Sequence, residues 1–338
     1  MIKSQPLSHF SPLANRDTSV HVETELPYTY SVPVSVQHLA RLELREDLHT
    51  LNESLTQFRE WVRKSRDIRN VRTDSNFLLR FLRAKKFSLP MAQQTLLKYL
   101  NLKKRFPKGT CDLDCLDPKV NDLVNSGYLF VSPVRDTQGR RVVIAVGSNL
   151  DPYKYTEDDQ FKIQMLTYET LLCDEETQVR GLTYFGDIKG VSTSHITLWS
   201  PTEFARAVKW GEQSIPARHK DVHFINVPSP IRYVYDFFLS KLSPKMKNRM
   251  RIHSNINEVH ESIGSECLPK EYGGTIPMAD MIESWKAELL ANREVLLGLD
   301  KMEILNPDAI IGRRNAGNRI NGVGESVVTG SFRRLEVD

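Results

Sequence analysis

The segment Val142-Val143-Ile144-Ala145-Val146 is the strongest apolar run in the chain, and its length suits a buried strand rather than a membrane span. It follows Asp136-Thr137-Gln138-Gly139, a turn with glycine where a positive φ is needed, and an earlier strand at 128–134 leads into that turn. Helices and strands alternate beyond this hairpin: helix 157–173, strand 182–185, helix 201–213 and strand 222–227. Such alternation predicts crossover connections, so we expect an α/β fold with a mainly parallel sheet flanked by helices.

A different pattern precedes the sheet. Between residues 36 and 110 the apolar residues follow helical spacing, most clearly at 74–87, where Asp74 is placed to cap the start of a helix. The residues that share one apolar face of this helix are Phe77, Leu78, Phe81 and Leu82. We therefore expect a small all-helical N-terminal domain over 36–110.

Both ends of the chain differ in composition from the parts between them. Residues 1–35 carry scattered proline, serine and threonine without a hydrophobic period, which predicts a mobile arm. The α/β domain is expected over 117–277, followed by an amphipathic helix at 278–300. The segment 301–338 is rich in glycine and arginine and is expected to be a flexible basic tail.

The charge balance of the chain limits the classes of ligand. Its 338 residues include 46 Lys and Arg against 42 Asp and Glu, a net charge of only +4. This balance argues against nucleic acid as a partner, so any basic function must be a local patch. The N-terminus lacks the charged segment and apolar core of a secretory signal, and the four cysteines suit a reducing compartment, so we expect a cytoplasmic protein.

The usual catalytic and metal-binding signatures are missing from the sequence. It has no GxSxG, GxxxxGK[ST] or HExxH motif, and Gly322-Val323-Gly324 lacks the third glycine of a dinucleotide loop. His219 and His223 lack a third ligand, so we interpret them as a surface and a core histidine rather than as a zinc site. The acidic pair Glu175-Glu176 is interpreted as a solvated helix cap. We expect a non-enzymatic protein without cofactor or metal.

Residues 231–242 form a short helix with large hydrophobic side chains on nearly every side. A helix of this kind is either buried in the core or covers something apolar. Composition alone leaves both alternatives open, but the segment directly precedes a basic helix and would close over a parallel sheet. We therefore predict a mobile lid that faces a ligand when closed and a bilayer when open.

The basic helix is predicted over 243–251, with Ser243 as N-cap and Pro244 at the first helical position. Lys245 and Arg249 lie four residues apart and would project from one helical face. An isolated cationic run is more often solvated surface. Near anionic lipid, however, each cation contributes about 1 kcal/mol, so a basic face beside an apolar lid favours reversible membrane docking.

Four stretches of the chain carry a resemblance to a known family. They are 77–87, the segment 175–190 with Glu175, Gly181, Asp187 and Gly190, the segment 214–227, and 268–274. In this order they resemble the CRAL-TRIO lipid-transfer family, in particular its animal branch with α-tocopherol transfer protein, cellular retinaldehyde-binding protein and the clavesins. The resemblance spans about residues 36–290.

The resemblance implies a lipid pocket floored by the sheet, a gate helix and a basic groove for phosphoinositide headgroups. The pocket would be lined by Phe161, Gln164, Met165, Tyr168, Leu182, Gly186, Ala207, Trp210, Ile215 and Val222. The gate would use Ile231, Val234, Phe237 and Phe238, and the groove would use Lys85, Arg218, Lys245 and Arg249. Gln164 and Tyr168 stand where the tocopherol protein has small hydroxyl residues, and Gly186 replaces a larger side chain, so neither relative's ligand can be assumed.

Together these features predict an intracellular monomer that encloses one tocopherol-, retinoid- or similar isoprenoid-like lipid. It would exchange the lipid through the gate helix at membranes with phosphatidylinositol bisphosphate-type headgroups, in peripheral and reversible contact with endosomal or plasma membranes. One alternative is a phosphoinositide-binding adaptor without ligand transport. Another is a lipid-modifying enzyme, which would need a nucleophile–base pair, and the sequence offers at best Tyr168 with no histidine near it.

Overall fold

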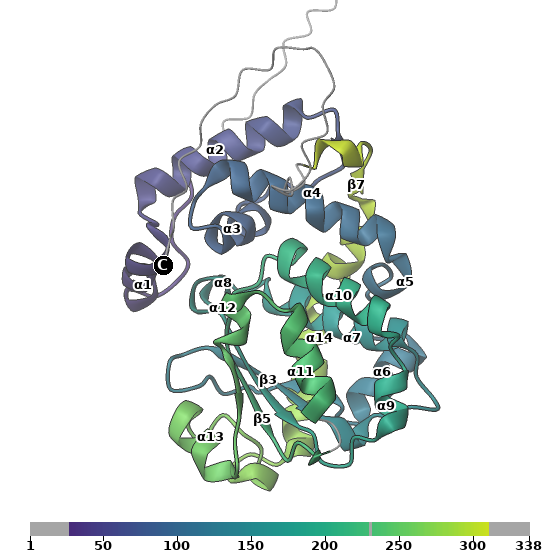
Figure 1. Cartoon of the computed structure of the whole chain (residues 1–338). Helices are drawn as coiled ribbons and strands as arrows, with labels where there is room; N and C mark the ends of the chain where they lie inside the picture. Colours follow the sequence, from purple (N-terminus) through teal and green to yellow (C-terminus); the bar gives the residue numbers. More distant parts are fainter. Residues whose placement is uncertain (1–26, 230–231, 311–338) are drawn as a thin grey trace, which may run out of the picture.

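The computed structural model describes residues 27–229 and 232–310, which form a helical part and an α/β part (Figure 1). The helical part consists of α1 (Val34–Leu44), α2 (Leu48–Lys64), α3 (Ser75–Ala84), α4 (Leu89–Arg105) and α5 (Pro107–Thr110). The predicted start of α3 is confirmed, because the Asp74 carboxylate accepts a hydrogen bond from the backbone N–H of Phe77 at 3.0 Å. The apolar face predicted for this helix is fully buried.

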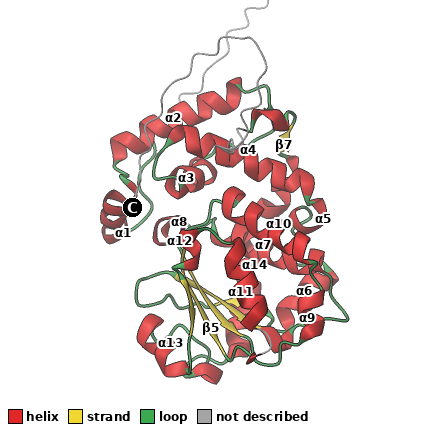
Figure 2. Ribbon diagram, viewed as in Figure 1, coloured by secondary structure: helices red, strands yellow, loops and turns green. Residues whose placement is uncertain are grey.

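A five-stranded sheet forms the centre of the α/β part, as Figure 2 shows. Its strands are β2 (Leu129–Val131), β3 (Arg141–Val146), β4 (Leu182–Asp187), β5 (His219–Ile225) and β6 (Met250–Ile252), in that order across the sheet. Only the β2–β3 hairpin is antiparallel, and Gly139 in its turn has a φ of 73°. The remaining pairs are parallel. The prediction of a mainly parallel α/β sheet is confirmed.

Alternate residues of β4 show which helices cover which face of the sheet. Tyr184 points toward α7 (Glu157–Leu171), with its ring centroid 6.4 Å from that of Tyr168. Phe185 points to the opposite face, 5.0 Å from the ring of Tyr272. Three helices lie on the α7 side, and α13 (Ile256–Ile263) lies on the other (Figure 1). The three are α10 (Pro201–Ser214), α11 (Arg232–Lys241) and α14 (Met278–Leu297).

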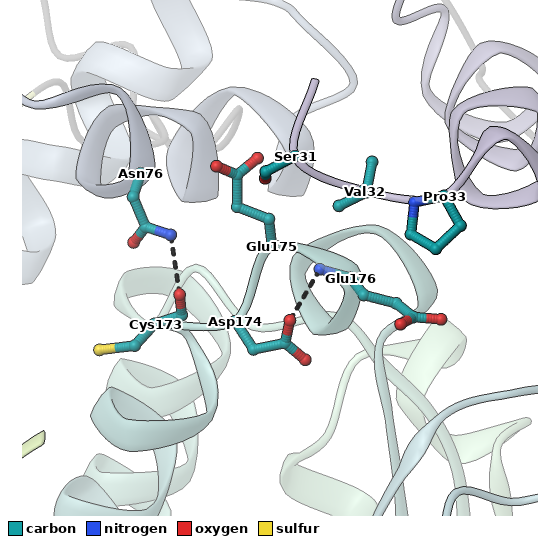
Figure 3. Close-up of a pocket in the computed structure, with 8 residues that line it drawn as sticks. All are labelled: Ser31, Val32, Pro33, Asn76, Cys173, Asp174, Glu175 and Glu176. Carbon is teal, nitrogen blue, oxygen red and sulfur yellow. Dashed lines mark hydrogen bonds between the residues drawn. The ribbon is translucent and has the colours of Figure 1, made fainter. Parts of the chain in front are cut away.

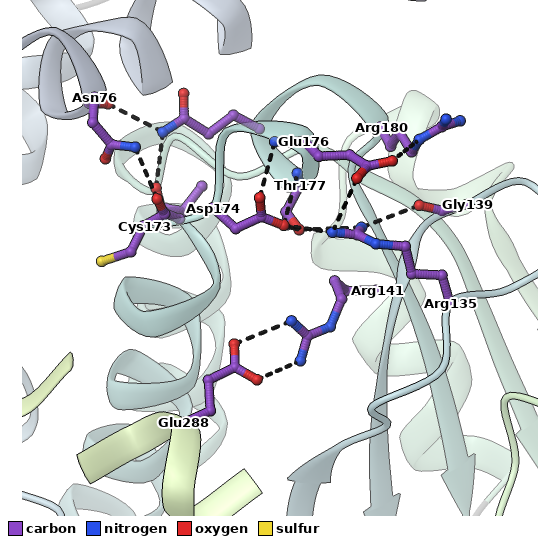
Figure 4. Close-up of polar contacts among 12 residues, drawn as sticks. Asn76, Arg135, Gly139, Arg141, Cys173, Asp174, Glu176, Thr177, Arg180 and Glu288 are labelled. Atoms are coloured by element: carbon purple, nitrogen blue, oxygen red, sulfur yellow. Dashed lines mark hydrogen bonds and ion pairs between the residues drawn. The ribbon is translucent and has the colours of Figure 1, made fainter. Parts of the chain in front are cut away.

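The remaining helices are short and connect these layers. They are α6 (Pro118–Asn125), α8 (Glu175–Arg180), α9 (Thr193–Thr197) and α12 (Pro244–Lys247). Arg135, in the turn region of the hairpin, contacts Asp174 at 2.5 Å, and Arg141 contacts both carboxylate oxygens of Glu288 on α14 (Figure 4). These pairs attach the hairpin to α8 and α14.

Buried ion pairs join the helical part to the α/β part. Arg83 contacts Glu46 at 2.8 Å and Glu175 at 3.0 Å. Arg80 contacts Glu169 on α7 at 2.7 Å. The sequence predicted that Glu175 is a solvated helix cap. The structure shows instead that Glu175 is the partner of a buried guanidinium. Asp174 is the residue whose side chain caps α8.

A polar cavity of about 360 Å³ lies at the same junction (Figure 3). The amide of Asn76 on α3 donates to the carbonyl of Cys173 at 2.8 Å at its edge. The cavity is lined by Ser31, Val32, Pro33, Asn76, Cys173, Asp174, Glu175 and Glu176. Its acidic lining makes it unsuitable for a hydrophobic ligand.

The basic segment differs from the helix predicted over 243–251. The Ser243 hydroxyl caps α12 as expected, accepting from the Met246 N–H at 3.3 Å, but the helix ends at Lys247. Residues 250–252 form β6, an edge strand parallel to β5. A three-residue edge strand owes its conformation to pairing with a neighbouring strand, so its own sequence carries no readable period.

Parts of the arm and the tail predicted at the two ends lie among the described residues and are folded. Residues 301–310 belong to the folded structure, because β7 (Glu303–Ile304) pairs with β1 (Ile68–Arg69) and Ile304 is buried. Residues 27–35 also have defined contacts, since the Tyr28 hydroxyl donates to Glu175 and α1 begins at Val34. Residues 1–26, residues 311–338 and Ile231 lie outside the described residues.

Candidate functional site

The pocket positions predicted on α7 share one face of that helix. Phe161, Gln164, Met165 and Tyr168 recur at spacings of three and four residues. Met165 is fully buried in the core, whereas the other three side chains are half-buried on the side that faces the sheet, α10 and the helical part. A capping box of Thr156 and Asp159 defines where α7 begins.

The remaining pocket positions lie on β4, β5 and α10. Leu182, Ile215 and Val222 are buried, and Ala207 and Trp210 are half-buried. A Cβ at Gly186 would come within 2.7 Å of Phe224 Cδ1, so the Phe224 ring occupies the space that a side chain at 186 would need. A Cβ at Gly211 on α10 would meet no atom within 4 Å, so there is open space beside this helix.

Aromatic contacts bring α7 and α10 together at the helical part. The ring of Phe106, which follows α4, lies 5.9 Å from Phe161 and 6.4 Å from Trp210 in T-shaped geometry. The guanidinium of Arg105 lies 5.2 Å from the centroid of the Trp210 ring. Phe161 and Trp210, two predicted pocket residues that are distant in the sequence, therefore both pack against Phe106.

The predicted gate segment is α11, which lies over α10 and β5. Phe238 and Val234 are half-buried, and Phe238 packs 5.4 Å from Phe204 of α10. Tyr235 packs 6.1 Å from Phe224 of β5. Phe237 is 37% exposed and lies beneath the ammonium group of Lys241 at 4.8 Å.

The outer face of α11 is also aromatic. Tyr233, four residues before Phe237, is 82% exposed. Large apolar side chains exposed on one helical face are characteristic of surfaces that contact protein or membrane. The adjacent phenylalanines thus differ in environment, with Phe238 turned to the protein and Phe237 to solvent.

Four polar side chains meet on the pocket side of the sheet. The Gln164 amide donates to the Tyr184 hydroxyl at 2.5 Å, and the ring of His219 lies 5.3 Å from Tyr168 and 5.7 Å from Tyr184. The sequence did not single out Tyr184. It suggested that His219 was a surface residue and that no histidine lay near Tyr168; the contact between these two rings shows that the second expectation was wrong. The two-residue period that puts Leu182 and Gly186 on the pocket face also puts Tyr184 there.

The four cations predicted for the basic groove lie in one cluster. Burial and the charges of Lys98 and Lys245 lower the pKa of Lys85. Burial, with Arg249, Lys86 and Arg218, lowers the pKa of Lys245. Burial is the larger cause of each lowering, and repulsion from another cation adds to it, so these side chains lie close enough together to attract an anion jointly. Four more cations lie close enough to act on this cluster, and the sequence did not point to them: Lys86, Lys98, Arg140 and Lys220.

One carboxylate already enters this cluster. Glu43 on α1 contacts Arg218 at 2.6 Å and Lys220 at 2.5 Å. Burial alone would raise the pKa of Glu43, but the hydrogen bonds from these two cations outweigh burial and lower it. Arg249 in turn donates to the backbone carbonyl of His219, which places the basic groove next to the polar cluster of the pocket.

Two further observations concern the described residues as a whole. In residues 27–229 and 232–310, no helix is both long and apolar enough to cross a membrane. Within the same ranges there is no group of three or more His, Cys, Asp or Glu side chains arranged to hold a metal ion.

Comparison with known proteins gives consistent matches. Residues 125–274 match the CRAL/TRIO domain. The mouse (Mus musculus) "Alpha-tocopherol transfer protein-like" is 33% identical over 281 residues, covering 80% of this chain and 81% of the relative. "Clavesin-1" of Xenopus laevis is 32% identical over 251 residues, covering 74% and 75%. The crystal structure of Sfh5 matches at 13% identity with a TM-score of 0.49, over 74% of this chain and 99% of that one. The chain therefore belongs to the CRAL-TRIO family of lipid-binding and lipid-transfer proteins.

Proposed function

We propose that the protein is a carrier that encloses one hydrophobic lipid between the sheet and helices α7, α10 and α11. The observation that carries this proposal is the set of half-buried side chains that these helices turn toward one another and toward the sheet. A packed core would bury them fully, as it buries Met165. The proposed lipid is tocopherol-, retinoid- or similar isoprenoid-like, and the name of the alpha-tocopherol transfer protein-like relative supports the first of these.

The carrier exchanges its lipid at membranes with phosphatidylinositol bisphosphate-type headgroups. Lys85, Arg218, Lys245 and Arg249 form the proposed headgroup site. Their closeness supports it, because the pKa of Lys85 is lowered by burial and by Lys245, and that of Lys245 by burial, Arg249 and Arg218. Each cation near an anionic surface contributes about 1 kcal/mol, so the cluster gives reversible attachment. The protein acts as a cytoplasmic monomer in peripheral contact with endosomal or plasma membranes.

Helix α11 is the proposed gate. A lipid tail of about fifteen carbons gains roughly 12 kcal/mol on leaving water, but it has the same gain inside a bilayer. The carrier therefore needs a pocket about as favourable as the bilayer, and a gate whose opening depends on the membrane. The exposed Tyr233 and Phe237 are suited to enter the headgroup region as the gate opens.

The first test is native mass spectrometry of the full chain purified from cells, with organic extraction of the bound lipid. We expect one lipid molecule per protein. The second candidate function is a phosphoinositide-binding adaptor, which the basic cluster alone would also support. Protein that contains no lipid, takes up none from vesicles and still binds phosphoinositide vesicles would establish the adaptor and overturn the carrier. A lipid-modifying enzyme would instead release a changed lipid from the same incubation.

A further inference from the structure

The polar cluster of Gln164, Tyr168, Tyr184 and His219 stands out in a pocket whose other lining is apolar. It is built from three elements, α7, β4 and β5, so its geometry is set by the sheet and not by a loop. Among the described residues, neither ring nitrogen of His219 has a hydrogen-bond partner, although the ring is enclosed by two tyrosines. The imidazole of His219 can therefore still donate one hydrogen bond and accept another.

The cluster is uncharged at neutral pH. Burial, with the nearby charge of Arg249, lowers the pKa of His219 to about 4. Burial raises the pKa of Tyr168 to about 12 and that of Tyr184 well above its ordinary value. The low dielectric that causes these shifts would also penalise any charged group brought in by a ligand.

We propose that this cluster receives the headgroup of the carried lipid and that the headgroup is an uncharged alcohol or carbonyl. This inference rests on the proposed carrier function and specifies the class of its ligand. Tyrosine hydroxyls donate and accept, and a neutral imidazole has one donor and one acceptor, so a hydroxyl or carbonyl oxygen finds partners here. An ammonium group is disfavoured by Arg249, and a carboxylate would have to be desolvated without a cation in hydrogen-bond contact.

A ligand series with one skeleton tests the inference. Geranylgeraniol, geranylgeranial, geranylgeranoic acid and the parent hydrocarbon are used to displace a fluorescent lipid from the full chain near neutral pH. We expect the alcohol and the aldehyde to bind at least about tenfold tighter than the acid and the hydrocarbon. In Tyr184→Phe and His219→Phe, the alcohol should lose most of this advantage while hydrocarbon binding changes little.

Tyr153→Phe is the matched control, because it removes the same hydroxyl from a side chain that is 86% exposed. Acid binding as tight as alcohol binding would overturn the inference, as would an unchanged alcohol-to-hydrocarbon ratio in both variants. Equal binding of alcohol and hydrocarbon by the natural protein overturns the headgroup assignment alone. Failure to bind both the fluorescent lipid and every member of the series would overturn the carrier function as well.

A second inference follows independently from Glu43. Its carboxylate bridges Arg218 and Lys220, and so lies where a phosphate group would have to contact the basic groove. Helix α1 packs in a small cluster of its own, separate from the main core, made of Val32, Val36, Ala40, Leu44 and Val179. Displacement of the Glu43 carboxylate needs only a change of its side-chain rotamer, because that side chain is 34% exposed.

The geometry points to Glu43 as a built-in competitor that restricts the groove to headgroups with several phosphates. A tethered carboxylate competes at high effective concentration, so a headgroup with one negative charge displaces it poorly. A headgroup with two or more phosphates gains more from the groove than Glu43 does. Glu43 thus increases specificity among anionic lipids by lowering the affinity of the groove for headgroups with one negative charge.

Vesicle co-sedimentation with phosphatidylserine, a phosphatidylinositol monophosphate or a bisphosphate tests this role. Glu43→Gln should tighten binding to the first two at least about fivefold and reduce the preference for the bisphosphate. Glu53→Gln on α2, whose side chain is 59% exposed, makes the same change of charge away from the groove. An unchanged preference in Glu43→Gln, or an equal effect of Glu53→Gln, would overturn the role. If the natural protein binds no anionic vesicle, the phosphoinositide function fails, and binding gained by Glu43→Gln would still support the competitor.

Discussion

Arg83 and Glu46 form an ion pair at 2.8 Å in which both side chains are fully buried. Glu175 and Gln178 each accept a further hydrogen bond from Arg83 at 3.0 Å, so the guanidinium is held between the helical part and α8. Removing one partner of a buried pair leaves a charge without compensation, whereas exposed pairs contribute little. The pair with Glu46 holds Arg83 in place to contact Glu175 and Gln178, so its loss should also weaken the attachment of the two parts.

We expect Glu46→Ala to lower the free energy of unfolding by about 3–5 kcal/mol in chemical denaturation. Glu303→Ala is the control, since it breaks the exposed pair with Arg69 and should change stability by only about 0–1 kcal/mol. A loss from Glu46→Ala as small as that of the control would show that the buried pair is not required.

The basic groove should control transfer and not lipid affinity. Lys245→Ala combined with Arg249→Ala removes two mutually repelling cations, so lipid affinity should stay within about twofold while transfer to phosphoinositide vesicles falls at least about tenfold. A fluorescent-lipid transfer assay at low and high salt measures this. Lys301→Ala, on the other side of the helical part near β7, is the control for loss of a charge. Equal loss of transfer to neutral and anionic vesicles would count against an electrostatic role.

A side chain at position 186 should reduce the volume of the proposed lipid pocket. Gly186→Phe displaces the Phe224 ring toward α11, so lipid stoichiometry should fall, with about 1–3 kcal/mol lost from stability. Phe224→Ala in the same chain should restore part of the lipid content, which mass spectrometry of extracted lipid would show. Gly211→Ala is the comparison, because its added methyl group meets no atom within 4 Å. Full lipid content in a folded Gly186→Phe variant would remove Gly186 from the pocket.

The two phenylalanines of α11 should respond differently to a charge. Phe237→Asp changes an exposed side chain, so the melting temperature should stay nearly constant while membrane-dependent exchange slows at least about tenfold, equivalent to roughly 1.4 kcal/mol on the barrier. Phe238→Asp also removes the contact with Phe204 and should lower the melting temperature. Exchange at the normal rate in Phe237→Asp would show that α11 is not the gate.

Acidification should destabilise the protein through two histidines. Burial lowers the pKa of His219 and of His223 to about 4, while both titrate near pH 6.5 when unfolded. Between these values the unfolded chain binds more protons, so stability is present above about pH 6.5 and is lost as the pH falls toward 4. Each histidine contributes up to about 1.4 kcal/mol per pH unit in this window.

Urea denaturation at several pH values, with His219→Phe and the exposed His49→Asn as variants, measures this slope. His219→Phe should make the dependence shallower, and His49→Asn should leave it unchanged because that side chain is 89% exposed. A slope in His219→Phe equal to that of the natural protein would mean that His219 is protonated normally in the folded state.

The sequence by itself determined the features that depend on near neighbours. The cap at Asp74, the cap at Ser243 and the glycine turn at Gly139 are all present, because each depends on residues within one turn of the chain. The alternation of strands and helices likewise predicted the parallel sheet, since crossover connections leave few other arrangements. The family was also recognisable from short stretches of sequence, and residues 232–241 of the predicted gate segment are helical.

Only the tertiary structure decided which side chains meet. Strand β6 exists through pairing with β5, and His219 joins Tyr168 and Tyr184 because β4 and β5 are adjacent under α7. Glu43 reaches Arg218 only because α1 packs on α8. Such contacts join residues far apart in the chain, and they form because packing of the core places whole elements side by side. Local periodicity fixes which face of an element is buried, but not which other element that face will contact.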